Sequence, residues 1–421
     1  MNRHRQHHLD SLRGIAALIV VLSHYVAAFY PYAIYGLQGN YQQKSFWEDL
    51  FFFPPFGLLV AGHFAVSLFF ILSGYVLSFG FLGEFRRMDR LVAAALKRPI
   101  RLGGLVFFTI IAGYGLWHGN LFYHIEVADI SGSKPWFSQY WEGEPDLSTL
   151  AADIATSLFS RGSTYNPPLW SIKVELYGSL LVFLFTAVFG RFKYRLLILL
   201  LLLCLFYRSF YAGFILGMIA ADIVQNHHFL SWTSNRYVSL CLLSFFLYFS
   251  SYPYCADSAF IRQTACYALP VPTWIGRGFP LIAAFALFVL VLSSRGAQKY
   301  LTHPIWIFFG KISYGVYAVH FLVLGSLSSY LFLTLSAHFG YAVSFLLILL
   351  SGLPIIIFLA YFSTKYIDEP AIWAASRLAA HMLDFLKSKR CFDMNGIPHS
   401  DGRLHLYADV SPCGSIEDKK K

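Results

Sequence analysis

The sequence predicts an all-α protein, a polytopic membrane bundle of about ten transmembrane helices with both termini in the cytoplasm. Composition indicates the class: of 421 residues, 57% are hydrophobic and 13% are charged, whereas soluble domains carry about 25% charged residues. The mean hydropathy is +0.56, and apolar segments of membrane length recur along the chain. These observations exclude an ordinary soluble protein.

Apolar runs between charged or turn-rich breaks define the expected helices. The predicted spans are, in order, 14–33, 63–82, 102–122, 169–189, 196–207, 209–225, 238–252, 279–293, 312–332 and 342–365. The fifth and sixth are short and close together, so we expect a tight hairpin whose turn lies near 207–209. Together the spans define a membrane domain, 9–376, followed by a polar cytoplasmic tail, 377–421, which we expect to be largely disordered.

Loop charges set the expected topology, because cytoplasmic loops carry an excess of Lys and Arg. With the basic N-terminus inside, the basic connections near 86–101, 191–195, 236 and 295–299 all fall in the cytoplasm, and the acidic loop 123–168 falls outside. The net charge of +10 is therefore chiefly a topology signal, and we expect membrane lipids rather than nucleic acid as partners. Cys255 and Cys266 lie in the same expected outer loop, where they either form a disulfide or remain as two thiols.

The first span contains an arginine at its foot and a histidine deep inside. Eleven residues separate Arg13 from His24, which is about three helical turns, so both project from one face. They lie about 16 Å apart, roughly half of a 30 Å hydrocarbon core. An ionisable side chain at that depth is costly and should face a cavity or a protein interior. A histidine satisfied by a neighbouring helix is the alternative.

Three further polar side chains fall at a similar expected depth in other spans. Glu175 lies about 10 Å below the outer boundary of the fourth span, Ser73 is in the middle of the second, and His320 is near mid-depth in the ninth. Each has a structural explanation alone. Their convergence with His24 from four helices favours a functional cavity.

A second polar group collects at the expected inner face. Asp10 and Arg13 are i,i+3 neighbours, and so are Arg98 and Arg101 at the foot of the third span. Ordinary topological anchoring with lipid-phosphate contacts is one interpretation. The other is a cytoplasmic site for a phosphorylated donor, since guanidinium groups match phosphate oxygens.

The chain resembles the acyltransferase-3 family of integral membrane acyltransferases. The matching motifs run in family order and cover most of the membrane domain: Leu9 to Gly14 with His24, Phe69 to Gly74, Lys97 to Arg101, Trp170 to Glu175, Gly213 to Gly217 with Ala220, Gly310 to Tyr314 with His320, and Asp368 to Pro370. Two departures are Lys173, where the family has a small or polar residue, and Gly103-Gly104 after the R-x-x-R motif, in place of proline.

The resemblance implies transfer of an acyl group, most often acetyl, from cytoplasmic acyl-CoA to a hydroxyl of an extracytoplasmic or membrane-bound glycan, at the plasma membrane. It implies acyl-CoA as co-substrate, with no permanently bound cofactor and no metal. Arg13, Arg98 and Arg101 would hold the CoA phosphates. His24 would act as a general base or acyl carrier, oriented by Glu175. The expected supporting residues are Asp10, Ser73, Trp170, Ser171, Tyr177, Tyr314 and His320.

A transporter or flippase of a glycan or small anion is the alternative function, because midplane ionisable groups mark transport pathways as well as catalytic sites. The sequence shows no inverted repeat and no pair of broken helices in matching positions, which favours the enzyme. An aromatic, acidic outer loop at 123–168 suits polyol binding in either case.

Overall fold

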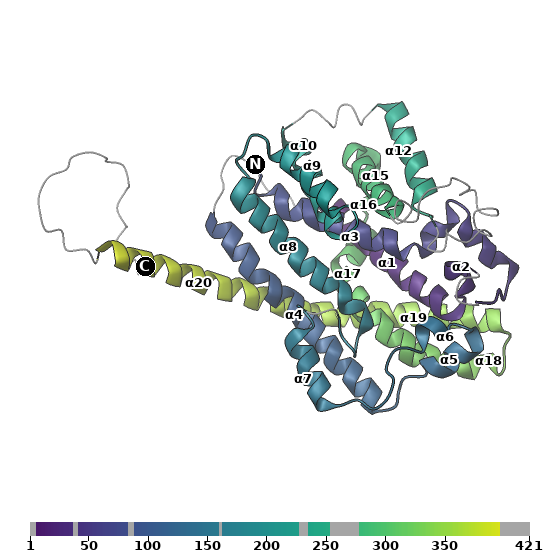
Figure 1. Cartoon of the computed structure of the whole chain (residues 1–421). Helices are drawn as coiled ribbons and strands as arrows, with labels where there is room; N and C mark the ends of the chain where they lie inside the picture. Colours follow the sequence, from purple (N-terminus) through teal and green to yellow (C-terminus); the bar gives the residue numbers. More distant parts are fainter. Residues whose placement is uncertain are drawn as a thin grey trace, which may run out of the picture. The chain divides into compact units, whose positions relative to one another are not determined.

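A computed structural model describes residues 6–36, 41–82, 88–159, 162–226, 235–252 and 278–395, and the regular elements within these ranges are all helices (Figure 1). Residues 1–379 form one compact unit, and residues 380–421 form a second. The longer helices are α1 (His7–Phe29), α3 (Gly62–Phe79), α4 (Met88–His118), α8 (Trp170–Phe189), α9 (Arg195–Phe206), α10 (Tyr211–Asn226), α12 (Arg236–Phe249), α15 (Phe279–Ser293), α17 (Pro304–Val323), α19 (Tyr341–Ser363) and α20 (Glu369–Asn395).

The all-α prediction is confirmed for the described part of the chain, and each predicted apolar span is helical there. Within these ranges, 6 helices are long and apolar enough to cross a membrane, or up to 7 if α15 and α16 (Arg295–Leu301), bent by 97°, form one broken span. Helices α9, α10 and α12 are apolar but shorter, at 10–17 residues. The chain is thus a helical membrane-type bundle, whereas the count of about ten crossings and the cytoplasmic termini stay predictions.

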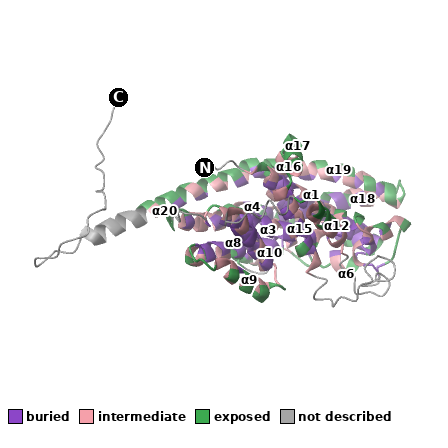
Figure 2. Ribbon diagram, turned by 90° about the horizontal axis from the view of Figure 1, so that it is seen from above, coloured by how far each residue is buried: buried purple, intermediate pink, exposed green. Residues whose placement is uncertain are grey.

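The predicted hairpin is present. Helix α9 ends at Phe206, α10 begins at Tyr211, and the two helices pack against each other through the turn at 207–210. Leucines on the outer face of α9, such as Leu201 and Leu205, are exposed (Figure 2). Apolar side chains on a helix surface are expected where lipid, rather than water, surrounds it.

Helix α1 lies at the centre of the bundle, between α17 and α3 (Figure 1). Near its start, a Cβ on Gly14 would lie 2.6 Å from the backbone nitrogen of Gly310 in α17. The two backbones therefore touch at a point where no other residue fits, as in close helix pairs in membranes. Ten residues further along each helix lie His24 and His320. The equal spacing shows that α1 and α17 run parallel, and it brings the two histidines together.

The long loop 123–168 folds into a small helical cap. It contains α5 (His124–Ser131), α6 (Lys134–Phe137) and α7 (Leu147–Thr156), and it leads through η4 (Pro167–Leu169) into α8. Trp141, in the left-handed region with φ of 51°, stacks on Phe122 at 3.8 Å between ring centroids. Its ring occupies the space above Gly325, where a Cβ would lie 2.5 Å from it. Gly325 belongs to the π-helical turn η5 (Leu324–Ser328), which joins α17 to α18 (Ser329–Ser336), so this contact fixes the cap on α17.

Shorter elements complete the fold. They are α2 (Tyr32–Tyr35), η2 (Phe46–Phe52), η3 (Phe56–Val60) and a second π-helical turn, η6 (Thr364–Asp368), between α19 and α20. Helix α20 continues to Asn395, so the first part of the predicted tail, which we expected to be disordered, is helical. Residues 396–421, as well as Cys255 and Cys266, lie outside the described residues.

Candidate active site

The two histidines of α1 and α17 form a direct pair. Nδ1 of His24 lies 3.2 Å from Nε2 of His320 and 2.9 Å from the carbonyl oxygen of Val20. On the far side, Nδ1 of His320 lies 2.7 Å from the carbonyl oxygen of Tyr317. His320 is fully buried, whereas His24 is half-buried. His24 is therefore the member of the pair that is open to a ligand.

Aromatic rings cover the half-buried histidine, His24. The indole of Trp136, from α6 in the cap, stacks on His24 with centroids 5.9 Å apart and an interplanar angle of 22°. Phe321 meets the same imidazole edge-on at 5.3 Å. The cap thus reaches down to the histidine pair and forms a roof over it.

A cavity of about 730 Å³ opens beside His24, at the end of α1 nearer Phe29. We call it the outer cavity. Its walls come from α1, α2, η2, η3, the start of α3, the cap, the start of α8, the hairpin turn, residues 250–252 after α12, the start of α15 and Tyr317 of α17. Aromatic and small polar side chains are prominent among the lining residues, including Ser23, His63, Trp136, Trp170, Tyr207 and Arg208. The described lining residues include no carboxylate.

Tyr317 links the histidine pair to α8. Its hydroxyl donates to the carbonyl of Pro168 at 2.6 Å, so it accepts from the hydroxyl of Ser171, also at 2.6 Å. Tyr317 also lines the outer cavity. Its carbonyl accepts from His320 within α17, and its hydroxyl contacts Pro168 and Ser171, so Tyr317 ties the helix that carries the buried histidine to the start of α8.

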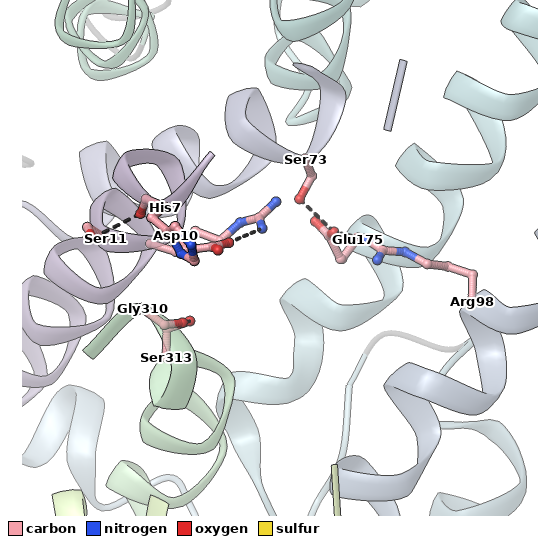
Figure 3. A network of polar contacts seen from close by, with 9 residues as sticks. His7, Asp10, Ser11, Ser73, Arg98, Glu175, Gly310 and Ser313 are labelled. Carbon is pink, nitrogen blue, oxygen red and sulfur yellow. Dashed lines mark hydrogen bonds and ion pairs between the residues drawn. The ribbon is translucent and has the colours of Figure 1, made fainter. Parts of the chain in front are cut away.

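A second polar group, which we call the inner cluster, lies between α3, α4 and α8. Glu175 accepts hydrogen bonds from Ser73 at 2.7 Å and, in a very short ion pair, from Nη2 of Arg98 (Figure 3). Nε of Arg98 donates to Ser179 at 2.8 Å. The side chains of Arg98 and Glu175 are 10% and 14% exposed, so this is a buried pair whose charges and hydrogen bonds satisfy each other.

The structure corrects the expected pairing of Glu175 with His24. Glu175 is bound by Arg98 and Ser73, and His24 is bound by Val20 and His320. The four residues expected at one depth therefore form two pairs. The helical depth estimate missed this because it placed residues along the membrane normal and carried no information about which helix faces lie opposite each other.

The other predicted inner residues gather around the inner cluster. Arg13 pairs with Asp10 at 3.6 Å, in the part of α1 drawn beside Ser73 in Figure 3. Arg101, one turn beyond Arg98, is exposed. The positive charges of Arg101 and Arg13 both act on Arg98. Tyr314 donates its hydroxyl to the carbonyl of Leu102 at 2.7 Å, which ties α17 to α4 beside these arginines.

Two predicted supporting residues of α8 have different surroundings. Trp170 lines the outer cavity and packs on Phe210 at 5.1 Å. Tyr177 is 38% exposed and is absent from the cavity wall.

Two residues of the site, Trp136 and Tyr317, were not predicted from the sequence. Tyr317 shares a helix face with His320, three residues away, and that spacing was a usable signal. No sequence signal indicated Trp136, since only the fold of the cap brings it to His24.

Comparison with known proteins defines the family. The profile of the acyltransferase domain family matches residues 6–363, and the chain belongs to this family. O-acetyltransferase PaAT-1 of Phomopsis amygdali is 26% identical over 210 residues, a match that covers 44% of this chain and 41% of that protein. The chain thus matches less than half the length of this relative. No solved structure matches the chain.

Proposed function

We propose that this protein is a membrane O-acyltransferase that moves an acyl group, acetyl in the first instance, from acyl-CoA to a hydroxyl of a carbohydrate or glycolipid. The position of His24 carries the proposal. Its imidazole forms part of the wall of the outer cavity, and Arg13 lies about three turns away on the same helix. Family membership and the name of the O-acetyltransferase relative support the reaction class.

The inner arginines suit a donor that carries several phosphates. Guanidinium groups bind phosphate oxygens in a forked geometry. Arg101 is exposed, and Arg13 is close enough to Arg98 for their charges to interact. In this proposal Arg13 and Arg101 contact the CoA phosphates, while Arg98 stays paired with Glu175. In this proposal the inner cluster faces the cytoplasm of a plasma-membrane protein, where acyl-CoA is available.

The outer cavity suits a sugar. The apolar faces of sugar rings stack on aromatic side chains, and Trp136 and Trp170 present such rings in its wall. Ser23 and Ser67 add hydroxyl groups to the same wall. A site that combines aromatic rings with a few placed polar groups is typical of small-molecule binding.

The chemistry needs one base between the two substrates. The imidazole of His24 takes the proton of the acceptor hydroxyl as its oxygen attacks the thioester carbonyl. The new C–O bond forms, the C–S bond breaks, and the CoA thiolate leaves with the proton that the imidazolium returns.

The proposal is tested with purified protein in lipid vesicles. Radiolabelled acetyl-CoA is supplied on one side, and label is followed into glycan and glycolipid extracts supplied on the other. We expect label in ester linkage to an acceptor, and none with His24→Ala, which should still bind acetyl-CoA. His381→Gln, an exposed position on α20, is the matched control and should retain full transfer.

Other outcomes separate the alternatives. Passage of an unmodified glycan or anion without acyl transfer would show a transporter. Label attached to the wild-type protein, but not to His24→Ala, when acceptor is omitted would show that His24 carries the acyl group, in place of general-base transfer.

A further inference from the structure

The hydrogen-bond acceptors around the histidine pair determine which nitrogens carry protons. A carbonyl oxygen only accepts, so Nδ1 of His320, at 2.7 Å from the carbonyl of Tyr317, must carry hydrogen. A neutral imidazole has one N–H. Nε2 of His320 is therefore an acceptor, and it faces Nδ1 of His24.

The same reasoning extends to His24. Its Nδ1 lies near two acceptors, the carbonyl of Val20 at 2.9 Å and Nε2 of His320 at 3.2 Å. Nδ1 therefore carries the hydrogen, and Nε2 holds the lone pair. His24 is the half-buried member of the pair and lines the outer cavity, so its basic nitrogen belongs to the ring that a ligand reaches.

We propose that His320 is the positioning residue of the active site: a neutral imidazole that accepts the Nδ1–H of His24 and leaves Nε2 of His24 as the base. The inference rests on the proposed acyl transfer. In hydrolase triads a carboxylate orients the catalytic histidine and stabilises its charged form. The sequence predicted Glu175 for this role, and the proposal gives it to His320.

The proposed step moves one proton along this path. Nε2 of His24 takes the hydroxyl proton as the acceptor oxygen attacks the thioester. The resulting imidazolium makes a charge-assisted hydrogen bond through Nδ1 to Nε2 of His320, and such bonds are about twice as strong as neutral ones. The Nε2 proton then passes to the CoA thiolate, and the pair returns to its neutral state.

Because the histidine pair is largely buried, the hydrogen bond between His24 and His320 matters for stabilising the imidazolium. His320 is 0% exposed, and Trp136 and Phe321 cover His24 with apolar rings. The described contacts of His24 include no carboxylate. An imidazolium formed in such surroundings gains little from solvent, so the two acceptors beside Nδ1, the carbonyl oxygen of Val20 and Nε2 of His320, stabilise it, and His320 is the one that a side-chain substitution can remove.

The test compares two substitutions at one position. His320→Leu removes the acceptor, and kcat should fall by about 100-fold, within the range general-base catalysis contributes, with the KM for acetyl-CoA changed less than about twofold. The side-chain oxygen of His320→Gln can accept the Nδ1–H of His24, so kcat should recover to within about tenfold of the wild type. His381→Gln is the control.

A spectroscopic measurement tests the bond independently of turnover. In protein labelled with ¹⁵N-histidine, an N–H···N hydrogen bond produces a scalar coupling between the two nitrogens, expected in the wild type and lost in His320→Gln and His24→Gln. A wild type that shows the coupling but transfers no acyl group would refute the proposed function alone. Absence of the coupling, wild-type kcat in His320→Leu, or a Gln variant no better than Leu would overturn the role of His320.

Discussion

The inner cluster and the outer cavity solve the problem of polar groups in an apolar bundle in opposite ways. The inner cluster uses full charges: Arg98 and Glu175 neutralise each other, with Ser73 and Ser179 taking up further hydrogen bonds. The outer cavity surrounds His24 with hydroxyls and aromatic rings, and its described wall holds one guanidinium, from Arg208, and no carboxylate. The arginines beside the neutralised pair, Arg13 and Arg101, suit the binding of phosphates, whereas an imidazole without an ion-pair partner suits a base that must take up a proton.

The two regions have separate hydrogen-bond networks. No residue of the inner cluster donates to or accepts from either histidine among the described hydrogen bonds, although α3 and α8 contribute side chains to both regions. Substitutions in one region should therefore change stability and donor binding, and substitutions in the other should change turnover and acceptor binding.

The largest expected effect on stability is at the buried ion pair. Glu175→Gln leaves the charge of Arg98 unpaired, and breaking a buried pair costs about 3–5 kcal/mol. Glu175→Met with Arg98→Met should recover most of this loss, because both charges are removed. Unfolding of the purified protein in detergent micelles measures the change.

A double-mutant cycle in the free energy of unfolding tests whether the inner cluster and the histidine pair are independent. Glu175 and Arg98 should be strongly coupled, whereas Glu175→Gln and His24→Gln should add to within about 0.5 kcal/mol. Strong coupling between Glu175 and His24 would restore the pairing that the structure contradicts.

The next effect concerns donor binding at the exposed arginine. Arg101→Ala should raise the KM for acetyl-CoA about tenfold, because a charge-assisted phosphate contact is lost at a site that solvent reaches. Stability should not change. Arg101→Lys should recover part of the effect, since it keeps the charge but loses the fork. Arg295→Ala, an exposed arginine on α16, serves as control; an equal change there would make Arg101 a topological anchor.

A smaller effect is expected for the roof of the outer cavity. Trp136→Ala should raise the KM for the acceptor about fivefold, since an aromatic stacking contact contributes about 0.5–1.5 kcal/mol, and should leave the KM for the donor unchanged. The acceptor KM of Trp136→Phe should lie between those of the wild type and Trp136→Ala. Trp373→Ala, at an exposed position of α20, is the control. A loss confined to the donor KM would contradict the assignment of the outer cavity to the acceptor.

The smallest effect is local and lies in the cap. Asp146 caps α7 by accepting from the backbone and hydroxyl groups of Ser148 and Thr149, and these hydrogen bonds lower the pKa of Asp146 to about 2. A depressed pKa means that the carboxylate stabilises the folded cap above about pH 4, and that this contribution is lost as the pH falls toward 2. Hydrogen exchange at the first turn of α7 should accelerate over that range in the wild type. Asp146→Asn, which can still cap, should show no such step.

The apolar segments and the key side chains were predictable from local sequence. Each expected span is helical in the described chain, and the hairpin turn near 207–209 is present, because apolar content and helix propensity act over short distances. His24, His320 and Glu175 stood out because ionisable groups are rare in apolar segments. The family resemblance was confirmed by the match over residues 6–363.

The partners of those side chains depended on the tertiary structure. Rise per residue gives the depth of Glu175 and His24, but the rotation of each helix about its axis decides whether Glu175 meets Arg98 or His24, and that rotation is set by packing such as the Gly14–Gly310 contact. The cap depends even more on long-range contacts, because Trp136 stacks on His24 from a segment that Trp141 packs against Gly325. Local sequence thus determined which polar groups enter the bundle, and the packing of distant helices decided which of them meet.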